Sequence, residues 1–369
     1  MSAAPVTTHL WLREETKPME HRAALSPEVC KQLLAQGFEI TVERSKERIF
    51  ADSEYADAGC TLVEGGAWRN APRDAIITGL KELPENDTTP LPHTHIMFAH
   101  CYKQQGGWKD VLSRFSEGNG LLYDLEFLTD DSGRRVAAFG FYAGFTGAAV
   151  GIDAWCHQQL NAGAKYPTIK AYPNEDVLIA ETKAKLAQIG RVPRIMVMGA
   201  LGRCGSGAVS YARKAGIPEE NILQWDMAET AKGGPFPEIM DADIFVNCIY
   251  LSAKIPPFVT QELLDGERRL SVIVDVSCDT TNPFNPIPIY SVNTTFDNAL
   301  LDIESANPKP LQLCSIDHLP TMLPREASNQ FASDLLPTLL QLPARASAPV
   351  WTRAEKLFHD KIESMATTD

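Results

Sequence analysis

The chain has 369 residues, which is long enough for two domains that each bury a hydrophobic core. Hydrophobic residues make up 44% of the sequence and charged residues 22%, as is typical of soluble globular proteins. The formal net charge of −13 argues against a nucleic-acid surface, which needs a basic patch, and no apolar run is long enough to suggest a membrane span.

The two ends of the chain predict a cytoplasmic protein. The first fifteen residues lack both the basic segment and the apolar segment of a secretory signal, and the last three do not form a peroxisomal signal. Eight cysteines are spread along the chain without a C-x-x-C pair. This spacing fits neither a zinc site nor a secreted disulfide framework, so we expect most of them to be buried thiols.

The first part of the chain alternates between strands and helices. The helix predicted at 26–37 begins with Ser26 as N-cap and Pro27 at its first position, and it ends at Gly37. Alternation of this kind implies parallel strands joined by helices. Strands are predicted at 9–15, 38–45, 60–65, 74–81, 95–100 and 120–128, and further helices at 53–59 and 105–118.

The second part repeats this alternation after a stretch rich in small residues, 138–162, which predicts a buried helix linking two domains. The predicted elements that follow are a helix at 175–190, strands at 194–199, 221–226, 242–251, 270–277 and 311–318, and helices at 324–342 and 348–365. We therefore expect an α/β fold with two Rossmann-like domains, each a parallel sheet flanked by helices, and a cleft between them. The expected domains are 1–137 with 325–369, and 138–324.

A glycine-rich loop, GALGRCGSG at 199–207, joins a predicted strand to a predicted helix. A dinucleotide-binding turn needs glycine where the chain bends, where backbone meets pyrophosphate and where helix packs on strand. Gly199, Gly202 and Gly205 suit these roles, although their spacing differs from G-x-G-x-x-G. The helix that follows would direct its N-terminal N–H groups at the phosphates. Taken alone, the loop is also compatible with an ordinary turn.

Asp226 strengthens the nucleotide interpretation. It ends the next predicted strand, 24 residues beyond Gly202, where a carboxylate can accept hydrogen bonds from the adenine ribose. Because a carboxylate repels a 2′-phosphate, the position favours NAD over NADP. The alternative is that Asp226 is the N-cap of the next helix, and the two roles are compatible.

Basic side chains follow the predicted strands of the first domain. Lys81 and His100 end two of these strands, and Arg22, Arg134 and Arg135 lie in loops. Together they favour a substrate with several carboxylates, although each one alone is compatible with an exposed loop charge.

The histidines near His100 do not predict a metal site. His93 and His95 would share one face of a strand while His100 points to the other, and no cysteine or carboxylate nearby completes a tetrahedral set. We therefore expect no metal, and we expect His93 and His95 to be loop or strand-start residues.

Ten segments of the sequence closely resemble the fungal NAD-dependent, L-lysine-forming saccharopine dehydrogenases, between about residues 8 and 360. That family shares its two-domain architecture with alanine dehydrogenases, in which the substrate domain comes first, and this would explain the late glycine loop. The segments are ETKPMEHRAALSP, GLKELPE, FAHCYKQQGGW, YDLEFL, GRRVAAFGFYAGF, GALGRCGSGA, WDMAET, NCIYL, DVSCDTTNP and SIDHLPTMLPREAS.

The resemblance implies the last step of fungal lysine synthesis, in which saccharopine, NAD⁺ and water give lysine, 2-oxoglutarate and NADH. It also implies a monomer that acts on small molecules, with no nucleic-acid or membrane partner. The implied catalytic pair is Lys81 and His100. The implied substrate contacts are Arg22, Lys81, Gln105, Arg135, Phe139, Ser277, Cys278 and Asp279. The implied nucleotide contacts are Arg134, Gly202, Arg203, Asp226, Thr230, Tyr250, Val276, Ile316, Asp317, His318 and Leu319. Cys278 departs from the family pattern, which usually has a smaller residue there.

Cys204 and Cys248 are a candidate disulfide. In the usual strand order, the strand that ends at Cys248 lies beside the strand that leads to the glycine loop, and the resemblance implies the same pair in relatives. A reducing cytoplasm favours free thiols, so both states remain open.

Two other functions remain as alternatives. An alanine-dehydrogenase-like enzyme of the same fold would not need three arginines for its substrate. A nucleotide-sensing module without turnover would not need Lys81 and His100 together. Formation of NADH and lysine from saccharopine distinguishes the expected enzyme from both.

Overall fold

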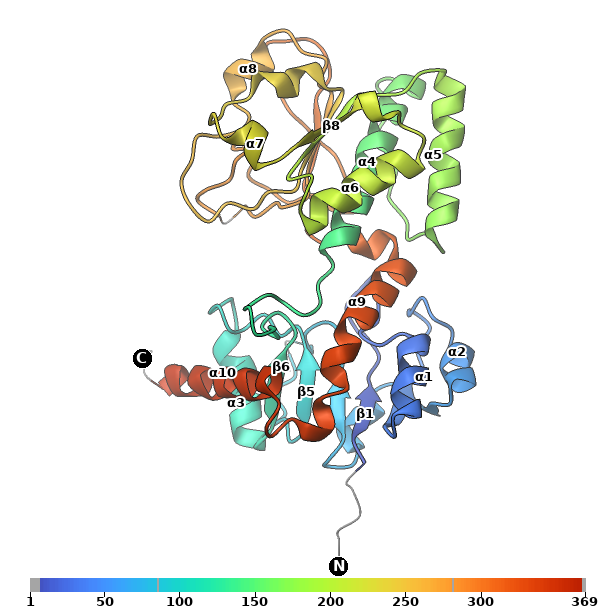
Figure 1. Ribbon diagram of the computed structural model, residues 1–369, viewed down its shortest axis with the longest axis vertical. Helices are drawn as coiled ribbons and strands as arrows, with labels where there is room; N and C mark the ends of the chain where they lie inside the picture. Colours follow the sequence, from blue (N-terminus) through green and yellow to red (C-terminus); the bar gives the residue numbers. More distant parts are fainter. Residues whose placement is uncertain (1–6, 85, 281, 367–369) are drawn as a thin grey trace, which may run out of the picture. The chain divides into compact units, whose positions relative to one another are not determined.

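The computed structural model describes residues 7–84, 86–280 and 282–366 (Figure 1). It divides into two compact units: the described residues up to Ala138, together with those from Pro324 onward, form unit 1, and Phe139–Leu323 form unit 2. The expectations for the extreme termini, including the outer domain bounds at 1 and 369, lie outside the described residues. None of the described helices is long and apolar enough to cross a membrane.

Unit 1 is built on a parallel six-stranded sheet in the order β3-β2-β1-β4-β5-β6. The strands are β1 His9–Leu12, β2 Glu39–Glu43, β3 Thr61–Val63, β4 Ile76–Thr78, β5 Thr94–Met97 and β6 Leu121–Asp124. All six strands predicted here are present. They are shorter than predicted because each predicted range ran two to four residues beyond the end of the strand, into the loop that follows.

Helices cover both faces of this sheet (Figure 1). They are α1 Pro27–Ala35, α2 Asp52–Ala58, α3 Trp108–Gly118, α9 Pro324–Leu339 and α10 Pro349–Ala366, with 3-10 turns η1 Ala67–Asn70 and η5 Leu342–Ala344. α1 contacts α2 and α9, whereas α10 contacts α3 and β6. The predicted start of α1 is confirmed, because the Ser26 hydroxyl accepts the Val29 N–H at 3.2 Å and Pro27 is the first helical residue.

His93, just before β5, and His95, its second residue, lie where a loop and a strand start were expected, but both are buried in unit 1. His95 is fully buried in β5, with its ring edge-on to Trp68 at 5.3 Å and to Phe115 at 5.4 Å. Burial keeps the pKa of His95 well below its usual value, so the ring is neutral. His93 lies just before β5, with Nε2 3.0 Å from the Ala71 carbonyl oxygen. Among the described residues, no group of three potential metal ligands is found.

Unit 2 contains a second six-stranded sheet, in the order β11-β12-β10-β9-β7-β8. The strands are β7 Ile195–Met198, β8 Ile222–Trp225, β9 Ile244–Asn247, β10 Val272–Asp275, β11 Leu301–Asp302 and β12 Gln312–Cys314. All of its strand pairs are parallel except that between β11 and β12. β11 was not predicted, because a two-residue edge strand has no periodicity to detect.

The helices of unit 2 are α4 Gly140–Leu160, α5 Glu175–Ile189, α6 Arg203–Lys214, α7 Met227–Thr230 and α8 Gln261–Asp265, with 3-10 turns η2 Glu219–Asn221, η3 Pro237–Asp241 and η4 Leu319–Met322. The predicted buried helix is confirmed as α4, which packs closely on α6 because glycines leave room for the backbones. A Cβ on Gly144 would lie 1.8 Å from the Cys204 carbonyl oxygen, and one on Gly207 would lie 1.9 Å from that of Phe141.

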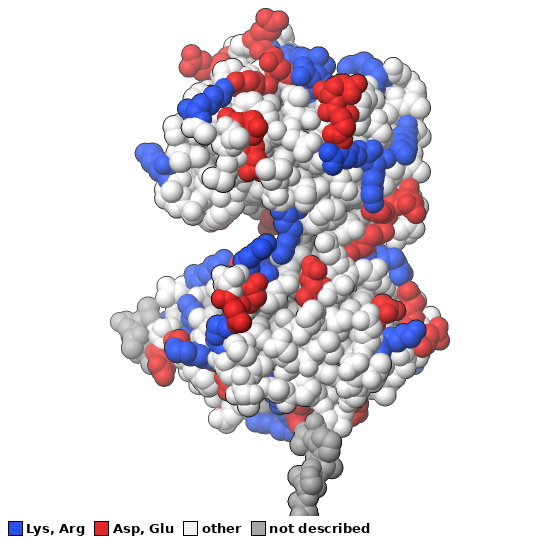
Figure 2. Space-filling view, viewed as in Figure 1, with Lys and Arg blue, Asp and Glu red and all other residues white. Residues whose placement is uncertain are grey.

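Charged side chains of both signs are interspersed on the face of each unit drawn in Figure 2. Within each unit, that face has no broad surface of one sign.

Candidate active site

In each unit, most of the predicted site residues follow the carboxyl ends of parallel strands, where ligands bind in α/β sheets. In unit 1 they are Arg22 after β1, Lys81 after β4, His100 and Gln105 after β5, and Arg134 and Arg135 after β6. In unit 2, Phe139 precedes α4. The other predicted site residues of unit 2 follow strands: Gly202 and Arg203 after β7, Asp226 and Thr230 after β8, Tyr250 after β9, 276–279 after β10, and 316–319 after β12.

His100 is held by a carboxylate that the sequence did not single out. Its Nδ1 lies 3.2 Å from Oε2 of Glu82, and Oε1 of Glu82 lies 2.7 Å from Nζ of Lys17. Burial alone would raise the pKa of Glu82, but the hydrogen bonds from His100 and Lys17 outweigh it and hold this pKa well below its usual value. Glu82 is therefore an ionised partner for both groups. The sequence could have indicated Glu82, because it directly follows Lys81 in the segment GLKELPE.

The backbone of His100 turns sharply, with φ at 51° in the left-handed region. Residues other than glycine rarely adopt this conformation, and it occurs disproportionately at functional sites. The ring stacks on Phe98, with centroids 6.3 Å apart, and 44% of the side chain stays exposed. His100 is thus fixed in place while its ring remains accessible.

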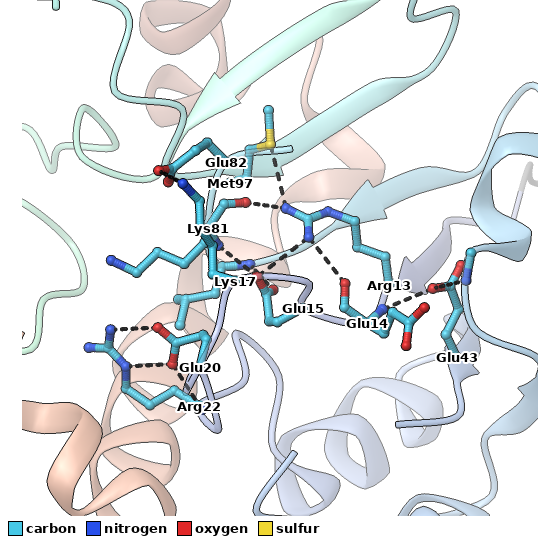
Figure 3. Close-up of polar contacts among 12 residues, drawn as sticks. Arg13, Glu14, Glu15, Lys17, Glu20, Arg22, Glu43, Lys81, Glu82 and Met97 are labelled. Atoms are coloured by element: carbon cyan, nitrogen blue, oxygen red, sulfur yellow. Dashed lines mark hydrogen bonds and ion pairs between the residues drawn. The ribbon is translucent and has the colours of Figure 1, made fainter. Parts of the chain in front are cut away.

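Arg22 is buried and paired with Glu20 (Figure 3). Nε and Nη2 of Arg22 donate to Oε1 and Oε2 of Glu20 at 2.9 and 2.8 Å. Burial would raise the pKa of Glu20, but the charge and hydrogen bonds of Arg22, aided by the charge of Lys81, lower it overall. A substrate carboxylate at Arg22 would therefore share the guanidinium with Glu20.

Glu126 joins the basic residues that follow β5 and β6. Its Oε1 lies 2.5 Å from Nζ of Lys103 and 3.5 Å from Nη2 of Arg135, which is half-buried. Gln105 accepts the Lys103 N–H at 2.9 Å. The neighbouring Arg134 is exposed, with its N–H donated to Asp130 at 3.0 Å. Arg135 and Gln105 are thus linked through Lys103 and Glu126.

A cavity of about 580 Å³ in unit 1 is lined by His100 and Gln105 together with Glu82, Asp87 and Arg114. Its size suits a small-molecule ligand. Unit 2 has cavities of about 520 and 350 Å³, but none of the predicted site residues lines them. The cavity of unit 1 is therefore the one associated with the predicted chemistry.

The glycine loop of unit 2 has the geometry of a phosphate-binding turn. Gly199 has φ at 84°, and a Cβ on Gly205 would lie 2.0 Å from the Gly199 carbonyl oxygen, so both positions require glycine. Gly202 is the N-cap of α6 and provides no side-chain cap. The exposed Arg203 is the first residue of α6. The first N–H groups of α6 are therefore available to an anion.

Asp226 follows β8 and caps α7, which confirms the N-cap role considered from the sequence. Its Oδ1 accepts the Met227 N–H and its Oδ2 accepts the Leu201 N–H, both at 2.9 Å. The Thr230 hydroxyl donates to the Asp226 carbonyl at 2.9 Å. A carboxylate has lone pairs beyond these two bonds, so a ribose contact stays a prediction.

The loops after β9 and β10 meet through Tyr250, whose hydroxyl donates to Asp279 at 3.3 Å. Cys278 donates its thiol to the Ser315 carbonyl at 3.3 Å. The neighbouring Val276 and Ser277 are half-buried. The loops after β9, β10 and β12 thus contact one another at one edge of the sheet.

The segment after β12 holds the last four predicted nucleotide contacts. Ile316 and Leu319 are buried, so any contact they make with a nucleotide is through the backbone. Asp317 is exposed and its Oδ1 lies 2.5 Å from Nδ1 of His318.

A buried network beneath these loops was missed in the sequence. Asp275, the last residue of β10, accepts from the Tyr290 hydroxyl at 2.6 Å and from the Asn247 amide at 2.9 Å. Burial raises the pKa of Asp275. Asn247 also donates to the Ile249 carbonyl at 3.2 Å. The network ties the ends of β9 and β10 together.

Cys204 and Cys248 are free thiols in the structure. The neighbouring Cys204 thiol and burial raise the pKa of Cys248. The two residues are in contact, and a disulfide between them stays a prediction.

Comparison with known proteins identifies the family. Residues 11–146 match the model for the alanine dehydrogenase/PNT N-terminal domain. A saccharopine dehydrogenase (NAD⁺, L-lysine-forming) from Yarrowia lipolytica is 61% identical over 361 residues, covering 96% of this chain and 97% of its own. The protein of that name from Schizosaccharomyces pombe is 56% identical over 367 residues, covering 98% and 100%. The chain belongs to this family. The resemblance noted in the sequence is thereby confirmed.

Two solved structures are similar in fold to this member of the saccharopine dehydrogenase family. An L-alanine dehydrogenase has a TM-score of 0.65 at 15% identity, covering 96% of this chain and 100% of its own. A transhydrogenase from Sinorhizobium meliloti has a TM-score of 0.60 at 17% identity, covering 92% and 96%. The predicted Rossmann-like α/β fold with two parallel-dominated sheets is therefore confirmed.

Proposed function

We propose that this protein cleaves saccharopine oxidatively, using NAD⁺ and water, to lysine, 2-oxoglutarate and NADH. The observation that carries the proposal is 56–61% identity, over nearly the whole chain, to proteins named saccharopine dehydrogenase (NAD⁺, L-lysine-forming). The reaction is the last step of fungal lysine synthesis. The protein acts in the cytoplasm as a monomer on small molecules, without nucleic-acid or membrane partners.

NAD fits the residues at the carboxyl edge of the sheet in unit 2. The N-terminus of α6, with Gly202 as N-cap, suits the pyrophosphate, and Asp226 suits the adenine ribose. When bound, NAD supplies the acceptor for the hydride. The other residues proposed to hold it are Arg134, Arg203, Thr230, Tyr250, Val276, Ile316, Asp317, His318 and Leu319.

Lys81 and His100 divide the proton transfers. The secondary amine of saccharopine must lose its proton before the adjacent carbon can be oxidised, and Lys81 takes that proton. His100 then takes a proton from the water that attacks the imine carbon. It returns this proton to nitrogen and then accepts the hydroxyl proton of the carbinolamine, as the C–N bond breaks to give lysine and 2-oxoglutarate. Because Nδ1 of His100 faces the ionised Glu82, Nε2 is the atom that exchanges the proton.

The remaining residues orient the substrate. Arg22 and Arg135 bind its carboxylates, each sharing its guanidinium with an acidic neighbour, Glu20 or Glu126. The other contacts are proposed at Gln105, Phe139, Ser277, Cys278 and Asp279.

A nicotinamide absorbance assay tests the proposal. Purified protein is incubated with NAD⁺ and either saccharopine, L-alanine or L-glutamate, and the products are identified by mass spectrometry. We expect NADH only with saccharopine, together with one lysine per NADH. NADH formation with L-alanine would favour the alanine-dehydrogenase alternative, and no NADH with any of the three would contradict the proposal.

A further inference from the structure

The N–H and the carbonyl of Lys81 are bound by side chains, just beyond the last bonds of the strand pairing. β4 ends at Thr78, and the Gly79 N–H still donates to the Ile96 carbonyl of β5 at 2.9 Å. Beyond it, the N–H groups of Leu80 and Lys81 donate to Oε1 and Oε2 of Glu15, at 2.6 and 3.0 Å. The Leu80 carbonyl still accepts the Phe98 N–H at 2.9 Å, so the last bond of the β4–β5 ladder and the carboxylate of Glu15 together hold the peptide that precedes Lys81.

Arg13 holds the other side of the same residue (Figure 3). Its Nη2 donates to the Lys81 carbonyl and contacts the Met97 sulfur at 3.6 Å. Its Nη1 lies 3.4 Å from Oε2 of Glu15. The side chains of Arg13 and Glu15 are only 2% and 7% exposed. One buried ion pair therefore binds both the N–H and the carbonyl of Lys81.

Gly79 makes this arrangement sterically feasible. A Cβ at this position would lie 2.3 Å from Cζ of Arg13 and 2.4 Å from its Nε. The guanidinium therefore packs directly against the backbone of the segment that leads to Lys81.

We infer that Arg13 and Glu15 are positioning residues for Lys81. They do not touch the reacting atoms, but they fix the Cα from which the Lys81 side chain extends. A buried ion pair is weak evidence for stability, because an apolar pair often serves as well. Here the hydrogen bonds of the pair converge on one residue, which is what positioning requires. The inference rests on the proposed function, in which Lys81 is catalytic.

Glu43 offers a matched control. It is a fully buried carboxylate that likewise accepts backbone N–H groups, those of Glu14, Gly66 and Trp68, at 2.9, 3.0 and 2.7 Å. It makes no hydrogen bond to Lys81 among those described for the two residues. Glu15→Gln and Glu43→Gln therefore both remove a buried charge that accepts backbone N–H groups. Only Glu15 is bonded to Lys81, whereas Glu43 is bonded to the intervening Glu14 N–H.

The test compares steady-state turnover of saccharopine by Glu15→Gln, Glu43→Gln and Lys81→Met. We expect kcat to fall about 10- to 100-fold in Glu15→Gln, with the KM for saccharopine and NADH binding changed less than about twofold, since small misplacements of a reacting group cost this much. Glu43→Gln should stay within about twofold of wild type below its unfolding midpoint. Adding Glu15→Gln to Lys81→Met should cause little further loss, because the group it positions is gone.

The possible outcomes distinguish the proposed catalytic role of Lys81 from the positioning role of Arg13 and Glu15. If Lys81→Met kept its turnover, the proposed role of Lys81 would be wrong. If Lys81→Met lost turnover but Glu15→Gln behaved like Glu43→Gln, only the positioning inference would be overturned. If Glu15→Gln did not fold, Arg13→Lys would serve as the second variant. It keeps the buried positive charge but loses the planar guanidinium with its several N–H donors, and the inference requires it to show the same fall in kcat.

Discussion

Asp226 combines a structural role with a proposed recognition role on one carboxylate. It caps α7 and accepts the N–H of Leu201 in the glycine loop. Charged hydrogen bonds are typically worth about 1.5–3 kcal/mol, so Asp226→Ala should weaken NAD binding roughly 10- to 100-fold and relax the discrimination against NADP. Fluorescence titration with NADH and NADPH measures both effects.

Glu229 provides a control that distinguishes the proposed ribose recognition by Asp226 from its capping of α7. Glu229 accepts the Asp226 N–H at 2.8 Å and completes the capping box of α7. Glu229→Ala should therefore disturb the cap without changing the preference for NADH over NADPH. Equal preference in wild type and Asp226→Ala would remove Asp226 from the ribose site.

Asp124 makes stability depend on pH. It is buried beside the site and accepts the N–H groups of Ala99 and Glu126 at 3.2 and 2.9 Å. Burial raises its pKa from 3.8 to about 6. Between these values the folded protein binds more protons than the unfolded chain, so stability falls as pH rises through this window. The contribution is about 3 kcal/mol.

The raised pKa of Asp124 is tested by how steeply the free energy of unfolding changes with pH, rather than by the stability at any one pH. Asp124→Asn removes the titration but also loses one acceptor, so it should be less stable than wild type in acid. Denaturant unfolding from pH 4 to 7 should show that wild type loses more stability than Asp124→Asn as pH rises. If the free energy of unfolding changed equally with pH in wild type and Asp124→Asn, the raised pKa of Asp124 would be contradicted.

At the scale of elements, the contact between α4 and α6 depends on the missing side chains of glycines. In Gly144→Ala the new Cβ would meet the rigid Cys204 carbonyl, and overpacking of this kind costs about 1–3 kcal/mol or more. Gly140→Ala, in the same helix, would meet only the flexible side chain of Arg203, at 3.3 Å. We expect Gly144→Ala to lower the denaturant midpoint of unfolding, while Gly140→Ala stays near wild type. Equal midpoints would show that the helices can separate without cost.

The elements also show how far a sequence can predict a site. The strands that precede Lys81, His100 and Asp226 were predictable because each is an apolar run followed by a polar residue, and parallel strands bring such ends to one edge. The partners of these residues were not predictable in the same way. Glu15 meets Lys81 only because β1 and β4 are neighbours in the sheet, and sequence periodicity does not specify which strands pair.

Short or polar elements were missed for a related reason. α8 and β11 are too short to show a period. His95 lies near the start of β5 as expected, but its burial between Trp68 and Phe115 depends on tertiary contacts that the local sequence pattern does not specify. The family resemblance supplied Gln105 and Tyr250, which no local pattern would have identified.

At the scale of the whole molecule, we propose that acid–base chemistry belongs to unit 1 and nucleotide binding mainly to unit 2. Loss of a catalytic group should therefore leave NADH binding nearly unchanged. Positioned acid–base groups typically contribute about 10²–10⁴-fold in rate, so Lys81→Met and His100→Gln should each lower kcat by about that factor. The double variant should lose less than the product of the two effects, because in a small site each group partly covers for the other.

The most direct test is the kcat for lysine release from saccharopine in Lys81→Met and His100→Gln, measured across pH with NADH affinity as the control. We predict a loss of about 10²–10⁴-fold in each variant, an altered pH profile and an unchanged NADH affinity. Near-normal turnover with an unaltered pH profile in both variants would contradict this prediction.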